Sequence, residues 1–341
     1  MKAKRILTAA ATVALVITSV FAGGNLTEVQ AKDNDTPKKI TLGYWESPNG
    51  ELLTKEKGSL EAAFPDTDVE WVEFQSGTDI LTAMQFGSID FATIGTPPAA
   101  LGLAKDYPFK IFYLHDIIGE SEGLVVKKDS GISSVKDLKG KKIATTFAST
   151  SHFSLLSALE AEGVSETDVT LYDMSAPDMY ASWQRGEIDG VYVWEPVKSQ
   201  LIDDGGVEIV SSEDMAEKGA LTAEVGIVSN SFYEKYPDVV KKYIDILDES
   251  VKSYRDDGKG AAKLMSGGLN LSEEETLTTM DEIIVKDKSE QAEYLGKNGE
   301  LAKVLKKTAD FLYDQKSLDK KADEKIFEQG ILSELYEGKQ S

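Results

Sequence analysis

Hydroxyl side chains crowd the start of the segment IATTFASTSHFSLLSALEAEG, which begins at Ile143. An amphipathic run follows the hydroxyls and predicts a helix. The segment contains no lysine or arginine. A helix N-terminus supplies free backbone N–H groups and the positive end of the helix dipole, and hydroxyls add neutral donors. The segment therefore predicts an anion site, although one hydroxyl also fits a helix cap. The candidate residues are Ser149, Thr150, Ser151 and His152.

An internal repeat supplies further candidates. SGTDILTAMQFGSIDFATIGTP, from Ser76, aligns without gaps with SAPDMYASWQRGEIDGVYVWEP, from Ser175. Each copy has a polar helix start, a helix, a glycine that can end it and a strand. Ligands of open α/β sheets bind at the carboxyl ends of strands. We therefore expect two similar lobes, with Gly95-Thr96 and Trp194-Glu195 facing each other across a cleft.

Enzymatic alternatives find little support. His115 and His152 are the only histidines, and no HExxH, GxSxG, P-loop or GxGxxG motif is present. Asp116 adjoins His115 and Ser151 adjoins His152, but adjacent residues rarely point at each other. We predict no enzymatic activity, no cofactor and no metal site. A structural or interaction protein would not need glycines and hydroxyls in both lobes.

Composition and charge narrow the class of protein. The chain has 341 residues with 41% hydrophobic and 28% charged residues, which fits a soluble globular protein of one or two domains. Its net charge of −22 excludes a phosphate-neutralising surface, so we expect no nucleic-acid partner.

The N-terminus has the layout of a secretory signal peptide at residues 1–31. Basic residues precede an uncharged run from Ile6 to Gly24, and small residues allow cleavage after Ala31 or after Ala22. An uncleaved membrane anchor is the alternative. The chain has no cysteine, so no lipid-modified cysteine or disulfide can form. We expect an exported protein, periplasmic or at the outer face of the cytoplasmic membrane.

Short apolar runs alternate with helical patterns from Ile40 onward, which predicts α/β units around largely parallel sheets. The predicted strands include VEWVEF, IDFATIG, FKIFYLHD and EGLVVKK. From Asn230 the pattern becomes helical and highly charged, and Ser272 and Glu275 have the spacing of a capping box.

Four blocks resemble the solute-binding proteins of ABC importers for taurine, alkylsulfonates and nitrate, most closely the taurine-binding members. The blocks are SGTDILTAMQFGSIDFATIGTPPAA, GESEGLVVKK, DLKGKKIATTFASTSHFSLLSAL and WQRGEIDGVYVWEP. The resemblance implies a type II periplasmic-binding-protein fold, in which two α/β lobes are joined by two crossing strands around a ligand cleft. We expect the crossings near Val125-Val126 and Gly226–Val228. The first lobe would comprise 38–125 and 228–341, and the second 126–227.

The resemblance also implies a site and partners. The family segments that match Ser149–Ser151, Ser76-Gly77-Thr78 and Gly95-Thr96 hold the sulfonate. An ammonium calls for an aromatic face or a carboxylate. The candidates for that role are Trp45, Glu46, Trp194, Glu195 and Glu224. The chain departs from the pattern at YWESPNG, because the taurine-binding relatives have an acidic residue nearer to Asn49.

We expect a monomer that delivers taurine or a similar small sulfonate to an ABC membrane permease. An alkylsulfonate, nitrate or a vitamin precursor is the alternative ligand. An enzyme like the pyrimidine synthases of this fold is less favoured, because their site is rich in histidine and cysteine.

Overall fold

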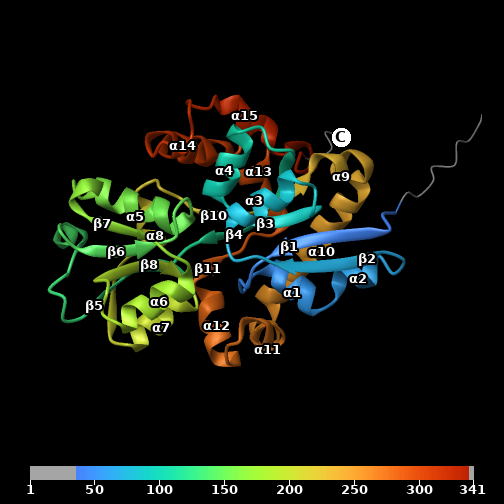
Figure 1. Cartoon of the computed structure of the whole chain (residues 1–341). Helices are drawn as coiled ribbons and strands as arrows, with labels where there is room; N and C mark the ends of the chain where they lie inside the picture. The colour runs from blue at the N-terminus through green and yellow to red at the C-terminus, as the bar shows by residue number, and fades with distance from the viewer. Residues whose placement is uncertain (1–35, 338–341) are drawn as a thin grey trace, which may run out of the picture. The chain divides into compact units, whose positions relative to one another are not determined.

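The structure is a computed structural model that describes residues 36–337. The predicted signal peptide lies outside the described residues. The described chain forms two β-sheets with helices packed on both faces of each (Figure 1).

The first sheet has the order β11-β4-β10-β3-β1-β2. Strands β1, β2 and β3 run parallel, whereas β10 is antiparallel to both of its neighbours, β3 and β4. The sheet consists of β1 (Lys39–Tyr44), β2 (Asp68–Glu73), β3 (Phe91–Gly95), β4 (Phe109–Ile118), β10 (Ala223–Ser229) and β11 (Ile283–Ile284).

The second sheet has the order β7-β6-β8-β5-β9. Strands β6, β7 and β8 run parallel, and β5 is antiparallel to β8 and β9. The sheet consists of β5 (Glu122–Lys127), β6 (Lys142–Thr145), β7 (Thr170–Asp173), β8 (Gly190–Trp194) and β9 (Gly206–Ser211).

The predicted repeat is present in both sheets. Ser76 caps α3 (Gly77–Gln85) and Ser175 caps α6 (Ala176–Gln184), each through an Oγ that accepts from the backbone N–H three residues later. Gly87 and Gly186 follow these helices with φ of 67° and 73°, a conformation that glycine adopts without strain. The orders β10-β3-β1-β2 and β5-β8-β6-β7 then correspond strand by strand.

The chain passes between the sheets twice. It leaves the first sheet after β4 and enters β5 across residues 119–121, and it returns between β9 and β10 across residues 212–222, which include α8 (Ser212–Glu217). The crossings expected near Val125-Val126 and Gly226–Val228 therefore fall inside strands β5 and β10. The lobe boundaries stay a prediction.

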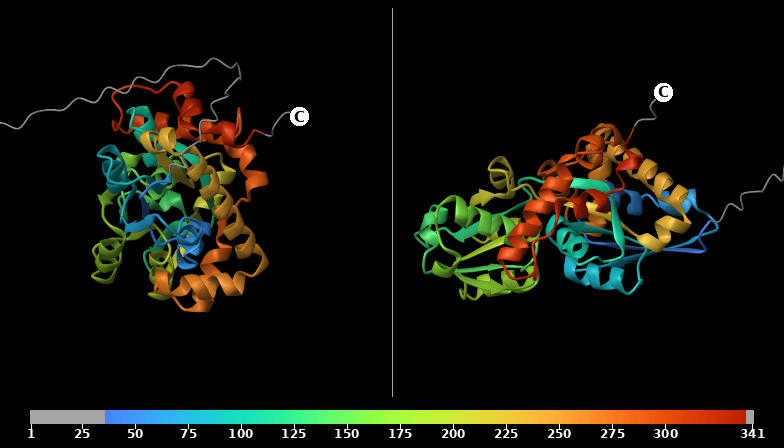
Figure 2. Two further views of the ribbon diagram at one scale, coloured as in Figure 1. Left: turned by 90° about the vertical axis from the view of Figure 1, so that its right-hand side faces the viewer. Right: turned by 90° about the horizontal axis from the view of Figure 1, so that it is seen from above.

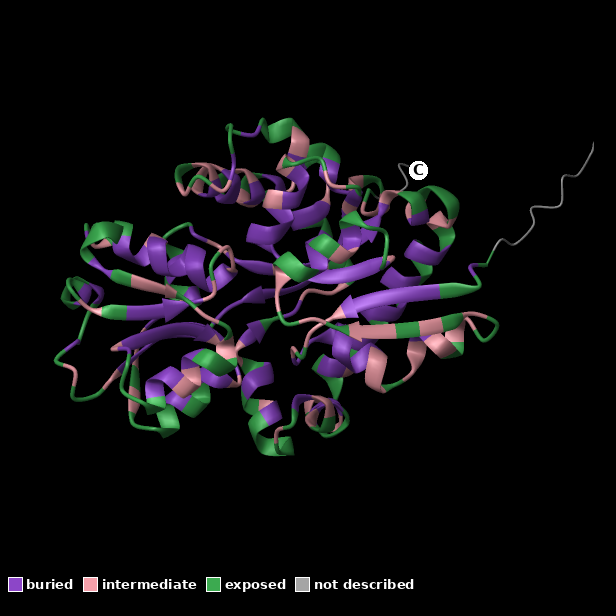
Figure 3. Ribbon diagram, viewed as in Figure 1, coloured by how far each residue is buried: buried purple, intermediate pink, exposed green. Residues whose placement is uncertain are grey.

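Burial explains the strand sequences. All residues of β3, FATIG, are buried, because helices cover both faces of this central strand. The edge strand β2 mixes exposed and half-buried residues instead. Figure 3 shows the same contrast between the buried central strands and the exposed outer parts of the helices.

The remaining helices before the tail cover the sheets. Helices α5 and α8 contact each other, as do α6 and α7, while α4 packs on β3 and β10. These elements are α1 (Gly50–Glu56), α2 (Ser59–Ala63), α4 (Thr96–Ala104), α5 (Thr150–Ala161) and α7 (Val197–Asp203), with 3₁₀ turns at Val135–Leu138, Glu166–Asp168 and Ser333–Leu335.

The tail is helical, as predicted, and Ser272 forms the capping box with Glu275. Its red helix α14 packs on α4 (Figure 2). The tail consists of α9 (Asn230–Lys235), α10 (Pro237–Asp256), α11 (Gly258–Leu269), α12 (Glu273–Asp281), α13 (Lys288–Leu295), α14 (Glu300–Asp314) and α15 (Glu324–Gly330).

Candidate functional site

The hydroxyls at the start of α5 have distinct roles. Ser149 is the N-cap: its Oγ accepts from the His152 N–H at 3.2 Å and donates to the Thr146 carbonyl at 2.6 Å. Thr150 Oγ1 donates to Glu122 Oε2 in β5 at 2.6 Å. The Thr150 proton therefore points at a buried carboxyl, and this hydroxyl offers only its lone pairs to other groups.

Two predicted hydroxyls are buried without a hydrogen bond of normal geometry. Thr96 Oγ1, in the first turn of α4, has no hydrogen bond to the described residues, and both Thr96 and Ser151 are 0% exposed. Ser151 Oγ, in the first turn of α5, makes no hydrogen bond of normal geometry, but it lies close enough to Glu122 to offset part of the rise that burial causes in the pKa of that carboxyl. Thr145 Oγ1, at the end of β6, also has no hydrogen bond to the described residues. A buried hydroxyl without a partner costs free energy, so these three are donors that an anion can satisfy.

The starts of α4 and α5 meet although they belong to different sheets. A Cβ on Gly95, the N-cap residue of α4, would lie 3.0 Å from Thr150 Cγ2 and 3.7 Å from Glu224 Oε1. Any side chain at position 95 would therefore press on the first turn of α5. The structure thus brings together three predicted site residues: Gly95, Thr150 and Glu224.

The other hydroxyl segment lies beside α4. Ser76 Oγ is occupied in capping α3 and also donates to the Asp79 carboxylate at 2.7 Å, while Thr78 is exposed. A Cβ on Gly77 would lie 2.5 Å from Pro98 Cγ in the first turn of α4. Gly77 therefore permits the close approach of the α3 and α4 N-termini.

Several predicted residues have structural contacts. His152 accepts from the Ala148 N–H through Nδ1 at 3.3 Å and stacks on Phe147, with ring centroids 4.5 Å apart. Trp45 is half-buried against the core beside α3 and α4, and Glu46 is exposed. His152 and Trp45 are thus engaged in packing, and none of the three residues forms a hydrogen bond or ion pair with Glu224 in the described chain.

The second strand end of the repeat lies next to the start of α5. Trp194 is half-buried and pairs in the β5–β8 ladder with Glu122, the carboxyl that accepts from Thr150. Glu195 is engaged elsewhere: its Oε2 accepts from the Ser199 N–H, and its Oε1 lies 3.3 Å from Lys198 Nζ. Of the two residues, Trp194 is therefore the one beside the Glu122–Thr150 pair, whereas the Glu195 carboxylate is already paired.

Glu224 lies on β10 opposite Gly95 on one side and Asp116 on the other. Its Oε2 is shielded from solvent and has no hydrogen-bond partner among the described residues. Burial is the largest cause that raises the pKa of Glu224 well above its usual range, and the charges of Asp116, Glu122 and Glu51 add to it.

A buried polar cluster behind Glu224 was not among the predicted site residues. Asp116 Oδ2 accepts from Asn49 Nδ2 at 2.9 Å, and burial raises the Asp116 pKa to about 7. Glu51 accepts from Thr93 Oγ1 at 2.5 Å and from Tyr243 at 3.0 Å, and burial raises its pKa to about 7.

His115 completes this cluster. Its Nε2 lies 3.7 Å from Glu51 Oε1, its side chain is fully buried, and neither ring nitrogen has a hydrogen bond within the described chain. Burial lowers the His115 pKa to about 3, so the ring is neutral. Asp116 bonds to Asn49 and not to its neighbour His115. The antiparallel insertion of β10, which places Glu224 opposite Asp116, has no signature in the sequence.

Among residues 36–337, no group of three or more His, Cys, Asp or Glu side chains is arranged to hold a metal ion. The same residues include no helix with the length and apolar character needed to cross a membrane.

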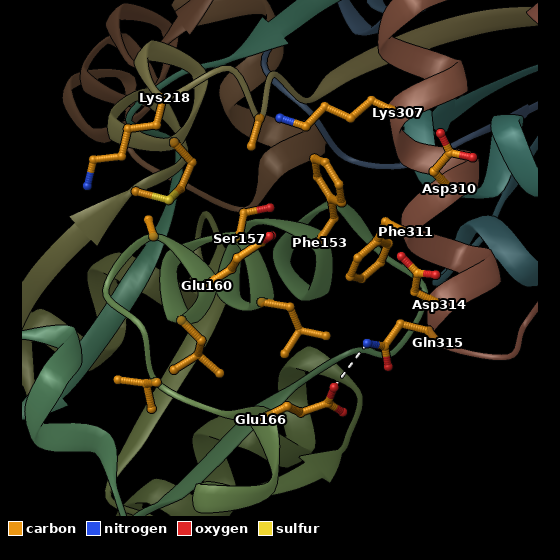
Figure 4. A pocket seen from close by; sticks show the side chains of 16 residues that line it. Phe153, Ser157, Glu160, Glu166, Lys218, Lys307, Asp310, Phe311, Asp314 and Gln315 are labelled. Carbon is orange, nitrogen blue, oxygen red and sulfur yellow. Dashed lines mark hydrogen bonds between the residues drawn. The ribbon is translucent and has the colours of Figure 1, made fainter.

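A cavity of about 740 Å³ lies between α5, α8 and α14 (Figure 4). Phe153 and Phe311 point into it from facing helices, and Glu166 on its border accepts from Gln315. None of the predicted site residues lines this cavity.

Comparisons with known proteins identify relatives. Residues 41–261 match the family model described as NMT1/THI5 like. The chain is 41% identical over 175 residues to the taurine-binding periplasmic protein of Escherichia coli strain K12, a match that covers 51% of this chain and 54% of that protein. A putative aliphatic sulfonates-binding protein of Bacillus subtilis strain 168 is 30% identical over 300 residues, which is 86% of each chain. The chain thus spans about half the length of the first of these relatives and most of the second.

Solved structures share the fold. The alkanesulfonate-binding protein SsuA from Xanthomonas axonopodis pv. citri, bound to MOPS, has a TM-score of 0.73 and 25% identity, with 84% of this chain and 96% of that chain covered. The desulfurization enzyme DSZB has a TM-score of 0.63 and 19% identity, with 87% and 97% covered, which shows the fold alone. The fold of periplasmic binding proteins predicted from the sequence is confirmed.

Proposed function

The chain belongs to the NMT1/THI5-like family, and on this premise we propose that it is an extracytoplasmic binding protein that delivers taurine or a similar small sulfonate to an ABC importer. The observation that carries the proposal is the meeting of the α4 and α5 N-termini, with buried hydroxyls in their first turns and Glu224 beside them.

The sulfonate end is assigned to these helix starts. A sulfonate is a weakly basic anion, so several neutral donors can hold it without an arginine. Thr96 supplies a hydroxyl donor that no described protein group uses, Ser151 supplies a second hydroxyl beside Glu122, and the first turns add backbone N–H groups. The relatives named for taurine and for aliphatic sulfonates support this class of ligand.

The ammonium end is assigned to Glu224, with Trp194 as the aromatic candidate. Glu224 lies opposite Gly95, with its Oε1 3.7 Å from where a Cβ on Gly95 would lie, and its Oε2 lacks a partner among the described residues. A carboxylate with a free oxygen forms a charge-assisted hydrogen bond with an ammonium. This assignment favours taurine over alkylsulfonates and nitrate, which carry no cation.

Catalysis is the less favoured alternative, although a desulfurization enzyme shares the fold. The chain has no cysteine for a thiolate nucleophile, and His115 is neutral and fully buried. An exported location and a membrane permease partner are part of this proposal, and the relative named as a periplasmic binding protein supports the export.

The test is binding without turnover. The mature protein, incubated with taurine, should show a rise in melting temperature that grows with ligand concentration, because ligand bound only to the native state stabilises it. Taurine recovered from the incubation should be unchanged by mass spectrometry. Recovery of sulfite or another product would identify an enzyme, and the absence of a shift with every sulfonate tested would refute the proposed function.

A further inference from the structure

Four carboxyl groups lie together around the proposed ammonium position. They come from α1, β4, β5 and β10 and are Glu51, Asp116, Glu122 and Glu224. The first three are only 4%, 1% and 1% exposed. No lysine or arginine of the described chain forms an ion pair with any of the four, and His115 is the single basic side chain within 4 Å of one.

The strand register fixes how Glu224 and Asp116 meet. They are directly opposed in the antiparallel β4–β10 pair, so their side chains leave the same face of the sheet. Gly95, opposite Glu224 on β3, has no side chain to separate Glu224 from Thr150. Thr150 in turn donates a hydrogen bond to Glu122. The Glu122 carboxyl therefore lies beside Thr150, as Glu224 does.

The hydrogen bonds within the group come from neutral donors. Asn49 donates to Asp116, Thr93 and Tyr243 donate to Glu51, and Thr150 and Ser212 donate to Glu122. Neutral donors stabilise one carboxylate each but do not cancel its charge. Buried carboxylates that lack a counter-cation repel one another, so they hold protons. The raised pKa values of all four carboxyls agree with this.

We propose that the ammonium of a zwitterionic aminosulfonate replaces a proton of this four-carboxyl cluster, so that binding selects aminosulfonates over simple alkanesulfonates and releases protons. The inference rests on the proposed sulfonate-binding function and names the substrate class within it. Glu224 contacts the ammonium, and Asp116 acts through Glu224 as a positioning residue. The carboxyls are thus both the source of the proton and the counter-charge of the ligand.

The two ligand classes should respond to pH in opposite directions. Taurine favours the ionised cluster, so its affinity should rise between pH ~5 and ~7, by up to about tenfold per pH unit if one proton leaves. Ethanesulfonate differs from taurine only by the missing amine and gains nothing from ionisation. Its affinity should stay constant or fall over the same range, because the added negative charge repels the anion.

Isothermal titration calorimetry of the mature protein tests the proposal. Each ligand is titrated near pH 6.5 in two buffers that differ in ionisation enthalpy, and the difference in heat gives the protons released. We expect release on the order of one proton with taurine and none with ethanesulfonate. Equal affinity for both ligands with no proton release would overturn the inference and leave the proposed function intact. Failure of both ligands to bind would instead count against the proposed function.

Two variants test which carboxyls release the proton, and a third variant serves as a matched control. Glu224→Gln should abolish proton release and reduce taurine affinity at least tenfold, with ethanesulfonate affinity kept. Asp116→Asn, which keeps the shape of the side chain, should lower the number of protons released and shift the pH midpoint of taurine binding downward. Glu73→Gln changes an exposed carboxyl at the end of β2 that is not a site candidate and should alter neither readout. Proton release that persists in Glu224→Gln would contradict the assignment.

Discussion

Thr150 and Ser151 are neighbours in the first turn of α5, yet their hydroxyls have opposite environments. Thr150 Oγ1 donates to the buried Glu122 carboxyl, whereas Ser151 Oγ is buried without a hydrogen bond of normal geometry. Removing the first hydroxyl leaves a buried carboxyl oxygen unsatisfied, whereas removing the second takes away a weaker interaction with the same carboxyl and a proposed ligand contact.

Single substitutions should therefore separate folding from binding. Thr150→Val keeps the methyl contact at Gly95 and should lower the free energy of unfolding by about 1–3 kcal/mol. Ser151→Ala should lower stability less than Thr150→Val does and weaken sulfonate binding by about 1.5–3 kcal/mol, as for a hydrogen bond to a charged group. Urea unfolding and calorimetric titration measure the two effects. If Ser151→Ala destabilises the fold and binds taurine normally, Ser151 is a core residue and not a ligand contact.

At the scale of elements, one face of α14 contacts the helices and loops around the second sheet. Lys307 donates to the Gly219 carbonyl at 2.6 Å, and Gln315 donates to Glu166 at 3.0 Å. Phe311, between them, meets Phe153 edge-on with ring centroids 5.0 Å apart. Lys307, Phe311 and the C-cap residue Gln315 are spaced four residues apart, so they lie along one stripe at the end of the helix.

The Phe311 contact should stabilise this docking. Phe311→Ala should reduce the free energy of unfolding by about 1–2 kcal/mol, the lower part of the range for an apolar side chain because Phe311 is only half-buried. Lys303→Ala, at an exposed position of the same helix, is the control and should change stability little. Denaturant unfolding of both variants checks the prediction. If both variants changed the free energy of unfolding equally, the change would come from helix propensity and not from loss of the aromatic contact.

Individual helices and strands can be predicted from the sequence better than the order in which the strands pair. The repeat was predictable because the serine caps, the stop glycines and the strands are all local signals. The hydroxyl-rich start of α5 was predictable for the same reason. The antiparallel insertion of β10 between β3 and β4 joins residues more than a hundred positions apart, and only that pairing puts Asp116 opposite Glu224. The carboxyl cluster could not be predicted from local patterns.

For the whole molecule, buried titratable groups make stability depend on pH. Burial raises the pKa of Glu51, Asp116 and Glu282 to about 7, so between pH ~4.5 and ~7 the native protein binds protons there that the unfolded chain does not. The stabilisation is complete below the unfolded pKa and is lost as pH rises through 7. His115 and His152 act in the opposite direction, because burial lowers their pKa to about 3 and about 4.

The carboxyls and the histidines have opposing effects on stability only below pH ~6.5. In that range a histidine of the unfolded chain is protonated, whereas the buried ring stays neutral. Above that pH the two histidines no longer contribute to the slope, and the buried carboxyls still do. We therefore expect the free energy of unfolding of the ligand-free protein to fall from pH 6 to pH 8, with a limit of about 1.4 kcal/mol per pH unit for each proton involved. Urea unfolding at pH 6, 7 and 8 measures the slope, and Glu51→Gln should flatten it. Stability that rises over this range would mean that the buried carboxyls are already ionised in the native protein.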